Sequence, residues 1–200
     1  MPEPTRIVEV KQLLVEGADG HRFFAALTSE MALSGIQVQN YGGVTELASF
    51  LKALRDTSGF RERVSSVGIV RDAEASASSA FQSVQSAVQN AGWEAPQQPM
   101  TPAGDSPKVT VLILPDANRP GMLEDLLLEA VSDDPVIPCV NKYFECVNAR
   151  LGSVPRPMPK ARAHAFLASR ERPHLRVGEA ADAGYWQLDN AAYNHDREFL

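Results

Sequence analysis

The sequence predicts an α/β fold with about four mainly parallel strands, flanking helices and a helical C-terminal appendage. Two observations carry this prediction. Strand-like and helix-like segments alternate four times in the first two thirds of the chain. The strand-like segments are apolar on both faces, which suits a parallel sheet covered by helices on both sides.

The predicted strands are short apolar runs that end near glycine or acidic residues. Their ranges are 11–15, 36–39, 64–70 and 109–114. Apolar residues at helical spacing predict helices between and after them, over 19–31, 47–54, 77–88 and 123–131. Residues 93–107 contain four prolines and few apolar side chains, so we expect a loop or hairpin there.

Beyond residue 135 the pattern changes to short helical pieces separated by prolines. We expect helices near 139–151 and 160–170 and a third piece at the C-terminus. The expected organisation is therefore an α/β domain over 8–135 and a helical extension over 136–200 that packs on the same domain. Trp186 and Tyr193 are expected to dock this extension.

Composition indicates a folded soluble chain. The 200 residues are 44% apolar and 22% charged, and no apolar run reaches the roughly 18 residues of a membrane span. Without a recognisable signal peptide, we expect a cytoplasmic protein in which Cys139 and Cys146 are small buried apolar residues. The lack of CxxC and HExxH motifs argues against zinc, and the lack of a GxxxxGK loop argues against nucleotide binding by this chain alone.

Charge is unevenly distributed along the chain. Residues 150–176 carry a net charge of +6, whereas the whole protein carries −6. This basic strip fits three interpretations: contact with a nucleic-acid backbone, contact with an acidic partner protein, or a solvated surface. On the first, the expected nucleic-acid-binding residues are Arg156, Lys160 and Arg162.

Acidic residues follow three of the predicted strands. Because the carboxyl ends of parallel strands meet at one edge of a sheet, these side chains are expected to converge there. Clustered carboxylates suit Mg²⁺ or Mn²⁺, which prefer oxygen ligands. The alternative for each acid is a helix cap or a solvated turn. The expected metal ligands are Glu16, Asp19, Asp72, Glu74 and Asp116.

Two of these positions carry the strongest argument. Glu16 directly ends an apolar strand and precedes a glycine. Asp72 and Glu74 are two residues apart, so they would point to the same side of an extended chain. Glu16, Asp72 and Glu74 are therefore the strongest candidates to bind a shared ion.

These motifs resemble a known family. A glutamate after the first strand (Leu14-Val-Glu-Gly-Ala-Asp19) and an acidic pair after the third (Gly68-Ile-Val-Arg-Asp-Ala-Glu74) are similar to the Toprim signature. With Leu114-Pro-Asp116, Gly121-Met-Leu-Glu-Asp125 and the tail Gly184-Tyr-Trp, nearly the whole chain resembles DUF3226, a stand-alone Toprim-like family related to OLD nucleases.

The resemblance implies a Toprim/Rossmann-like fold and a Mg²⁺-dependent site that cleaves phosphodiester bonds. In it, Glu16 matches the motif glutamate, and Asp72 and Glu74 match the DxD acids, with glutamate in place of the last aspartate. The resemblance therefore implies that Glu16, Asp72 and Glu74 are the catalytic carboxylates. It also implies an ABC/SMC-like ATPase as partner in a phage-defence module.

Two classes of function follow. The first is a metal-dependent nuclease or nuclease subunit acting on DNA or RNA. The second is a catalytically silent regulatory or sensor subunit that keeps the fold and binds an ATPase partner. The sequence leaves open the oligomeric state, a homo-oligomer included, and the cation that would assist at the phosphate, for which Lys142, Lys160, Arg162 and Arg119 are candidates.

Overall fold

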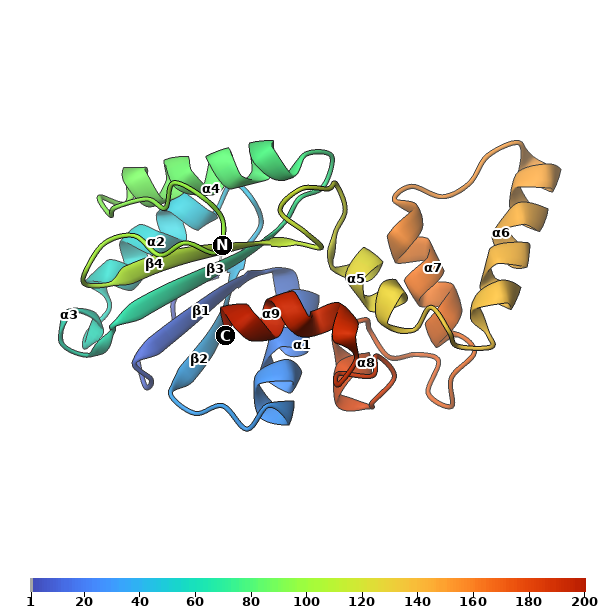
Figure 1. The fold of residues 1–200 in the computed structure, drawn as a ribbon, viewed down its shortest axis with the longest axis horizontal. Helices are drawn as coiled ribbons and strands as arrows, with labels where there is room; N and C mark the ends of the chain where they lie inside the picture. The colour runs from blue at the N-terminus through green and yellow to red at the C-terminus, as the bar shows by residue number, and fades with distance from the viewer. Residues whose placement is uncertain (1) are drawn as a thin grey trace.

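A four-stranded parallel sheet forms the centre of the protein (Figure 1). The structure, a computed structural model, describes residues 2–200. The strand order is β2-β1-β3-β4, which confirms the predicted α/β fold. The strands are β1 (Lys11–Glu16), β2 (Ile36–Gly42), β3 (Ser66–Asp72) and β4 (Lys108–Leu114).

Helices cover both faces of this sheet. The crossover helix α1 (Gly17–Glu30) packs on one face, while α2 (Leu47–Asp56), α3 (Phe60–Arg63) and α4 (Ala77–Asn90) pack on the other (Figure 1). Alternate residues of each strand enter two separate hydrophobic clusters, one on each face. Burial on both faces explains why the strands read as continuous apolar runs.

The C-terminal third is helical and shares the cluster that contains α1. Buried residues of the sheet, such as Leu112, and of the C-terminal helices, such as Phe166, belong to this single cluster. In Figure 1 two helices of this part extend beyond the end of the sheet, α6 and α7. The elements are α5 (Leu123–Ala130), α6 (Ile137–Leu151), α7 (Met158–Leu167), α8 (Glu179–Asp182), η1 (Ala191–Tyr193) and α9 (Asn194–Phe199).

Two aromatic residues dock the C-terminal segment, as expected. Trp186 is fully buried, stacks on Phe166 at 5.2 Å between ring centroids, and donates its indole N–H to the carbonyl of Val177 at 2.8 Å. Tyr193 is also fully buried, contacts Phe23 of α1, and donates its hydroxyl to the carbonyl of Trp186 at 2.7 Å. The polar atom of each buried ring thus has a hydrogen-bond partner, as is usual for buried Trp and Tyr.

The structure corrects one expectation about the cysteines. Cys139 and Cys146 are exposed on α6 and not buried as small apolar residues. Only one side of α6 enters the core, through Ile137, Val140 and Phe144. The segment 93–107, expected as a loop or hairpin, runs beside β4 and forms an antiparallel bridge between Ala103 and Val109.

The connections around β1 create a topological switch point. The chain leaves β1 for β2 on one side, and then returns to place β3 on the other side. Open parallel sheets bind ligands at the carboxyl ends of the strands where this reversal occurs. Within residues 2–200, no helix is long and apolar enough to cross a membrane.

Candidate functional site

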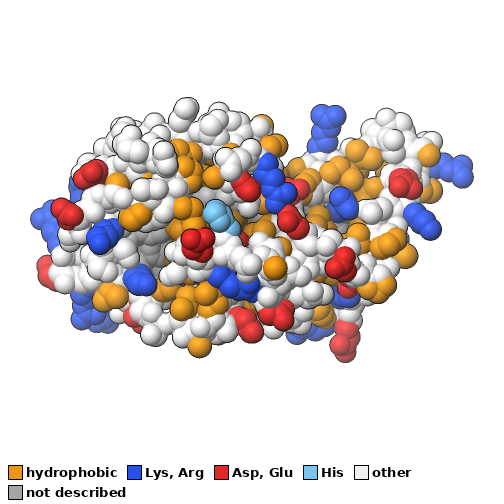
Figure 2. Space-filling view, in the orientation of Figure 1, with side chains coloured by type: hydrophobic (Ala, Val, Ile, Leu, Met, Phe, Trp, Pro, Cys, Tyr) orange, Lys and Arg blue, Asp and Glu red, His pale blue; other side chains and the backbone are white. Residues whose placement is uncertain are grey.

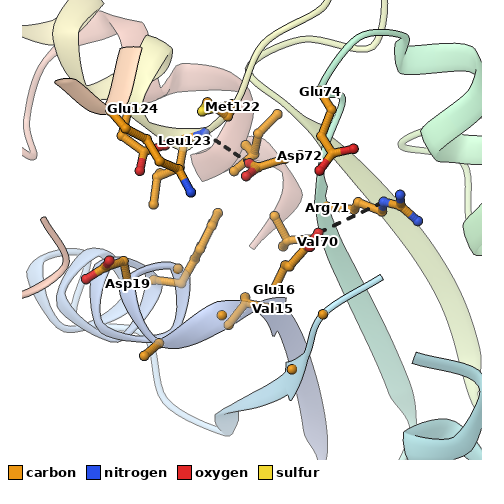
Figure 3. Close-up of a pocket in the computed structure, with 18 residues that line it drawn as sticks. Val15, Glu16, Asp19, Val70, Arg71, Asp72, Glu74, Met122, Leu123 and Glu124 are labelled. Carbon is orange, nitrogen blue, oxygen red and sulfur yellow. Dashed lines mark hydrogen bonds and ion pairs between the residues drawn. The ribbon is translucent and has the colours of Figure 1, made fainter. Parts of the chain in front are cut away.

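A cavity of about 310 Å³ opens at the carboxyl end of the sheet (Figure 3). Its walls come from the ends of β1 and β3, the start of α1 and the start of α5, with one side chain from α7. Five carboxylates and one amine are among its lining residues: Glu16, Asp19, Asp72, Glu74, Glu124 and Lys160.

Glu16 and Asp72 end the two neighbouring strands of the switch point. β1 and β3 pair in parallel, with Val15 opposite Val70, so the next residues of both strands reach the same edge. Gly17 has a φ of +72°, a conformation that favours glycine, and it lets α1 begin directly after Glu16. The Glu16 side chain makes no capping hydrogen bond to α1, so capping does not explain the glutamate.

Asp72 is the most perturbed carboxyl group of the cavity. Burial raises its pKa to about 7, and the nearby carboxylates of Glu124 and Glu16 add to the rise. Its Oδ1 accepts a hydrogen bond from the backbone N–H of Leu123 at 2.9 Å, at the start of α5. That bond opposes the rise but does not cancel it.

Glu16 is held from behind by a buried arginine. The Nε of Arg71 lies 4.0 Å from the Glu16 Oε2, and Arg71 also donates to the Ser83 hydroxyl at 2.9 Å. Burial raises the pKa of Glu16, Arg71 opposes this rise, and the Glu74 carboxylate adds to it. The Arg71 Nε has no hydrogen-bond partner within the described residues. The Glu16–Arg71 contact is therefore a long ion pair without a hydrogen bond at this nitrogen.

Glu74 departs from extended backbone geometry. Its φ is +51° and its backbone forms a bridge with Gly121. The extended geometry assumed for the Asp72–Glu74 pair therefore ends before Glu74. Glu74 nevertheless lines the cavity, on the side of Glu16 and Arg71 (Figure 3).

The remaining predicted ligands differ in position. Asp19 lines the cavity, but its Oδ1 accepts the backbone N–H of Gly178 at 3.0 Å, and Figure 3 shows it apart from Glu16 and Asp72. Asp116 does not line the cavity, and its carboxylate instead accepts the N–H of Asn118 at 2.7 Å within a turn. The structure thus brings Glu16, Asp72 and Glu74 together, with Asp19 at the margin and Asp116 outside.

The predicted basic residues also differ in whether they reach the cavity. Lys160 enters the cavity from α7 and lowers the pKa values of Glu16, Asp72 and Glu124 by its charge. Arg162 donates to the Asn141 side chain at 2.6 Å, and Arg156 is exposed outside the cavity. Of the candidate cations, Lys160 is the one that the fold places at the carboxylates.

Sequence reasoning assigned no role to two charged residues of this site. Glu124 is 5% exposed, and burial raises its pKa; an acidic residue in the first turn of a helix is also favoured by the helix dipole, so its sequence position alone does not indicate a site. Arg71 was a single charge in an apolar strand, which was the available signal for a buried ion pair.

The donor set suits a hard cation, although no ligand cage is preformed. Among residues 2–200, no three His, Cys, Asp or Glu side chains are grouped closely enough to hold a metal ion. Mg²⁺ usually keeps several waters and binds through one or two carboxylates, so a complete cage is not required. The mutual repulsion of Asp72, Glu16 and Glu124 is the observation that a cation would relieve.

Fold and cavity together define a parallel α/β protein with a carboxylate-rich pocket at its topological switch point. Residues 10–200 match a family described as protein of unknown function, DUF3226. Since the match spans nearly the whole chain, the protein belongs to the DUF3226 family. Comparison with curated proteins and with solved structures finds no match.

Proposed function

We propose that the protein is a Mg²⁺- or Mn²⁺-dependent Toprim-type nuclease, or the nuclease subunit of a complex, that cleaves phosphodiester bonds of DNA or RNA in the cytoplasm. One observation carries the proposal. Glu16 and Asp72 end neighbouring strands and line one cavity with further carboxylates and an amine, Lys160. Carboxylates with a nearby cation are the components of metal-assisted phosphoryl hydrolysis.

In this proposal Glu16 and Asp72 hold the ion, and Glu74 and Glu124 complete its surroundings. A bound ion would polarise the phosphate and lower the pKa of an attacking water. Arg71 keeps Glu16 charged and oriented from behind. Lys160 binds a phosphate oxygen and neutralises charge that the carboxylates would otherwise repel.

The nucleophile in this proposal is water. None of the described residues that line the cavity is a serine, threonine, cysteine or tyrosine. Carboxylates and lysine can also form covalent intermediates, but in this proposal the carboxylates hold the ion and Lys160 binds the phosphate. Hydrolysis therefore fits the cavity better than strand rejoining.

The test compares two buried aspartates on plasmid, single-stranded DNA and RNA, with Mg²⁺ and with Mn²⁺. Asp72→Asn should reduce metal-dependent cleavage by at least about 100-fold, because it removes a charged ligand. Asp196→Asn is the matched control, since burial also raises the pKa of Asp196 to about 7 but this residue lies outside the cavity. Equal loss in both variants would contradict the proposal.

A second candidate is a catalytically silent subunit, and two observations favour it. The described residues offer no preformed three-ligand metal group, and position 74 holds glutamate where the resembled motif has aspartate. On the family resemblance, the partner would be an ABC/SMC-like ATPase in a phage-defence module. Absence of cleavage with and without a neighbouring ATPase, together with a stable complex of the two, would select this candidate.

A further inference from the structure

An apolar groove of about 580 Å³ runs between α6 and α7, separate from the carboxylate cavity. On the α7 side, three small residues at helical spacing line it, Ala161 and Ala165 of the helix and Ala168 at its C-terminal cap, together with His164 and Ser169. Its α6 wall includes Val140 and Tyr143. The Tyr143 side chain is 57% exposed, which is unusual for a ring that lines an apolar surface.

The apolar face continues along α6 beyond the groove. Leu151 is 74% exposed and lies seven residues after Phe144, on the same side of the helix. α6 and α7 extend beyond the sheet in Figure 1, and residues on both sides of the groove, such as Tyr143 and Ala168, are exposed. Figure 2 shows hydrophobic side chains at this end of the molecule, between projecting Lys and Arg side chains.

The sequence segment that forms the groove is basic, whereas the protein as a whole is acidic. Residues 136–172 contain seven Lys and Arg but two Asp and Glu, in a protein whose net charge is −6. Arg156 adjoins the groove residue Pro155, and Arg150 lies seven residues after Tyr143 on the same side of α6. Both arginines are exposed.

We propose that the α6–α7 groove binds an acidic amphipathic helix of a partner protein. The alanines of α7 let a third helix approach closely, and the apolar walls accept residues at the i, i+3, i+4 and i+7 positions of such a helix. The basic rim selects acidic residues on the partner's flanks.

Charge and chemistry disfavour the other occupants. A symmetric pairing with a second copy would bring two basic rims together, which is repulsive. A single-stranded nucleic acid would need a series of exposed ring faces for base stacking, whereas of the Tyr143 and Phe144 rings in the groove only Tyr143 is exposed, and most other lining residues are aliphatic or small. This inference is independent of whether the carboxylate cavity is catalytic.

The probe is a designed amphipathic peptide of about 18 residues with leucine on one face and glutamate on the other. A sibling peptide carries lysine in place of glutamate. We expect the acidic peptide to bind the full-length protein in fluorescence anisotropy, and the lysine peptide to bind at least about tenfold more weakly. Equal binding of the two peptides, or no binding of the acidic one, would overturn the proposal.

Two variants place the binding in the groove. Ala168→Glu adds charge and bulk at an exposed groove position and should weaken the acidic peptide by about tenfold or more. Tyr143→Ser removes an exposed ring and should weaken it several-fold without a loss of fold. The matched control is Ala53→Glu, an exposed alanine of α2 outside the groove, which should leave the affinity unchanged.

The same proteins test the other occupants. Sedimentation should show the unmutated protein without a dimer that depends on the groove, and oligo-dT should bind the Ala168→Glu and unmutated proteins equally. A dimer lost only in Ala168→Glu would assign the groove to a second copy. Loss of oligo-dT binding in Tyr143→Ser would assign it to nucleic acid.

Discussion

Asp72 and Asp196 are two buried aspartates in different surroundings. Burial raises the pKa of each to about 7. Asp72 lines a cavity where other carboxylates face it and Lys160 offers a positive charge. Asp196 is 1% exposed in α9, and its Oδ1 has no hydrogen-bond partner within the described residues. A perturbed pKa is thus shared by both, and only the access and the convergent charges distinguish a candidate site.

The two aspartates differ in what makes the charged carboxylate unfavourable. At Asp72 the cost of burial is increased by like charges, so a cation that enters the cavity would remove it. At Asp196 the remaining described influences are its own backbone and Arg197, which both favour the charged form. The same substitution at each aspartate, measured with and without metal, therefore distinguishes a cation site from a carboxylate that is merely buried.

The largest effect is expected from the cavity lysine. Lys160→Met should lower nuclease activity by about 10²- to 10³-fold, because one preformed positive contact to a developing charge contributes that much. Arg156→Met is the control, since Arg156 is an exposed cation of the same strip outside the cavity. Similar losses from both changes would place the phosphate contact in the strip as a whole.

A smaller effect on activity is expected from the arginine behind Glu16. Arg71→Met removes the charge that opposes the rise in the Glu16 pKa, so the pH at which activity is half-maximal should move upward. The readout is the pH profile of kcat/KM, which a purely structural role would not shift. Arg55→Met is the control, because Arg55 donates to the carbonyl of Ala91 away from the cavity.

Stability should respond to both aspartates in the metal-free protein. A carboxyl group with a raised pKa in the folded state makes that state bind more protons, so the free energy of unfolding falls as pH rises from about 4 to about 7. Asp72→Asn and Asp196→Asn should each reduce this slope and stabilise the protein at pH 8 by roughly 1–3 kcal/mol. Urea unfolding at pH 5 and pH 8 measures it, and a slope unchanged by either substitution would refute the assigned pKa.

Much of the fold was predictable because the determining signals are local. β1, β3 and β4 contain continuous apolar runs, β2 alternates apolar and polar residues, and helical spacing located α1, α2, α4 and α5 within a few residues. The order of the strands in the sheet depends on contacts between distant residues. The alternation of strands and helices predicted a parallel sheet, and the pairing of β1 with β3 in that sheet brings Glu16 and Asp72 to one edge.

The site was harder to predict where the backbone leaves regular geometry. The left-handed conformation of Glu74 depends on a bridge to Gly121, more than 40 residues away, and spacing cannot show that contact. Asp116 and Asp19 were equally plausible ligands in sequence. Asp116 accepts a local hydrogen bond from Asn118 within a turn, and Asp19 accepts a tertiary one from Gly178, and both lie apart from the central pair. The exposure of Cys139 likewise depends on how α6 projects from the core.

Binding of Mn²⁺ by titration calorimetry tests the central claim, that the carboxylates at the β1–β3 switch point form a divalent-cation site. The unmutated protein and Asp196→Asn should bind with equal affinity, and Asp72→Asn at least about tenfold more weakly. The affinity of the unmutated protein should rise with pH toward 7, as Asp72 loses its proton. Equal binding by Asp72→Asn and the unmutated protein, or no binding by either, would contradict the account.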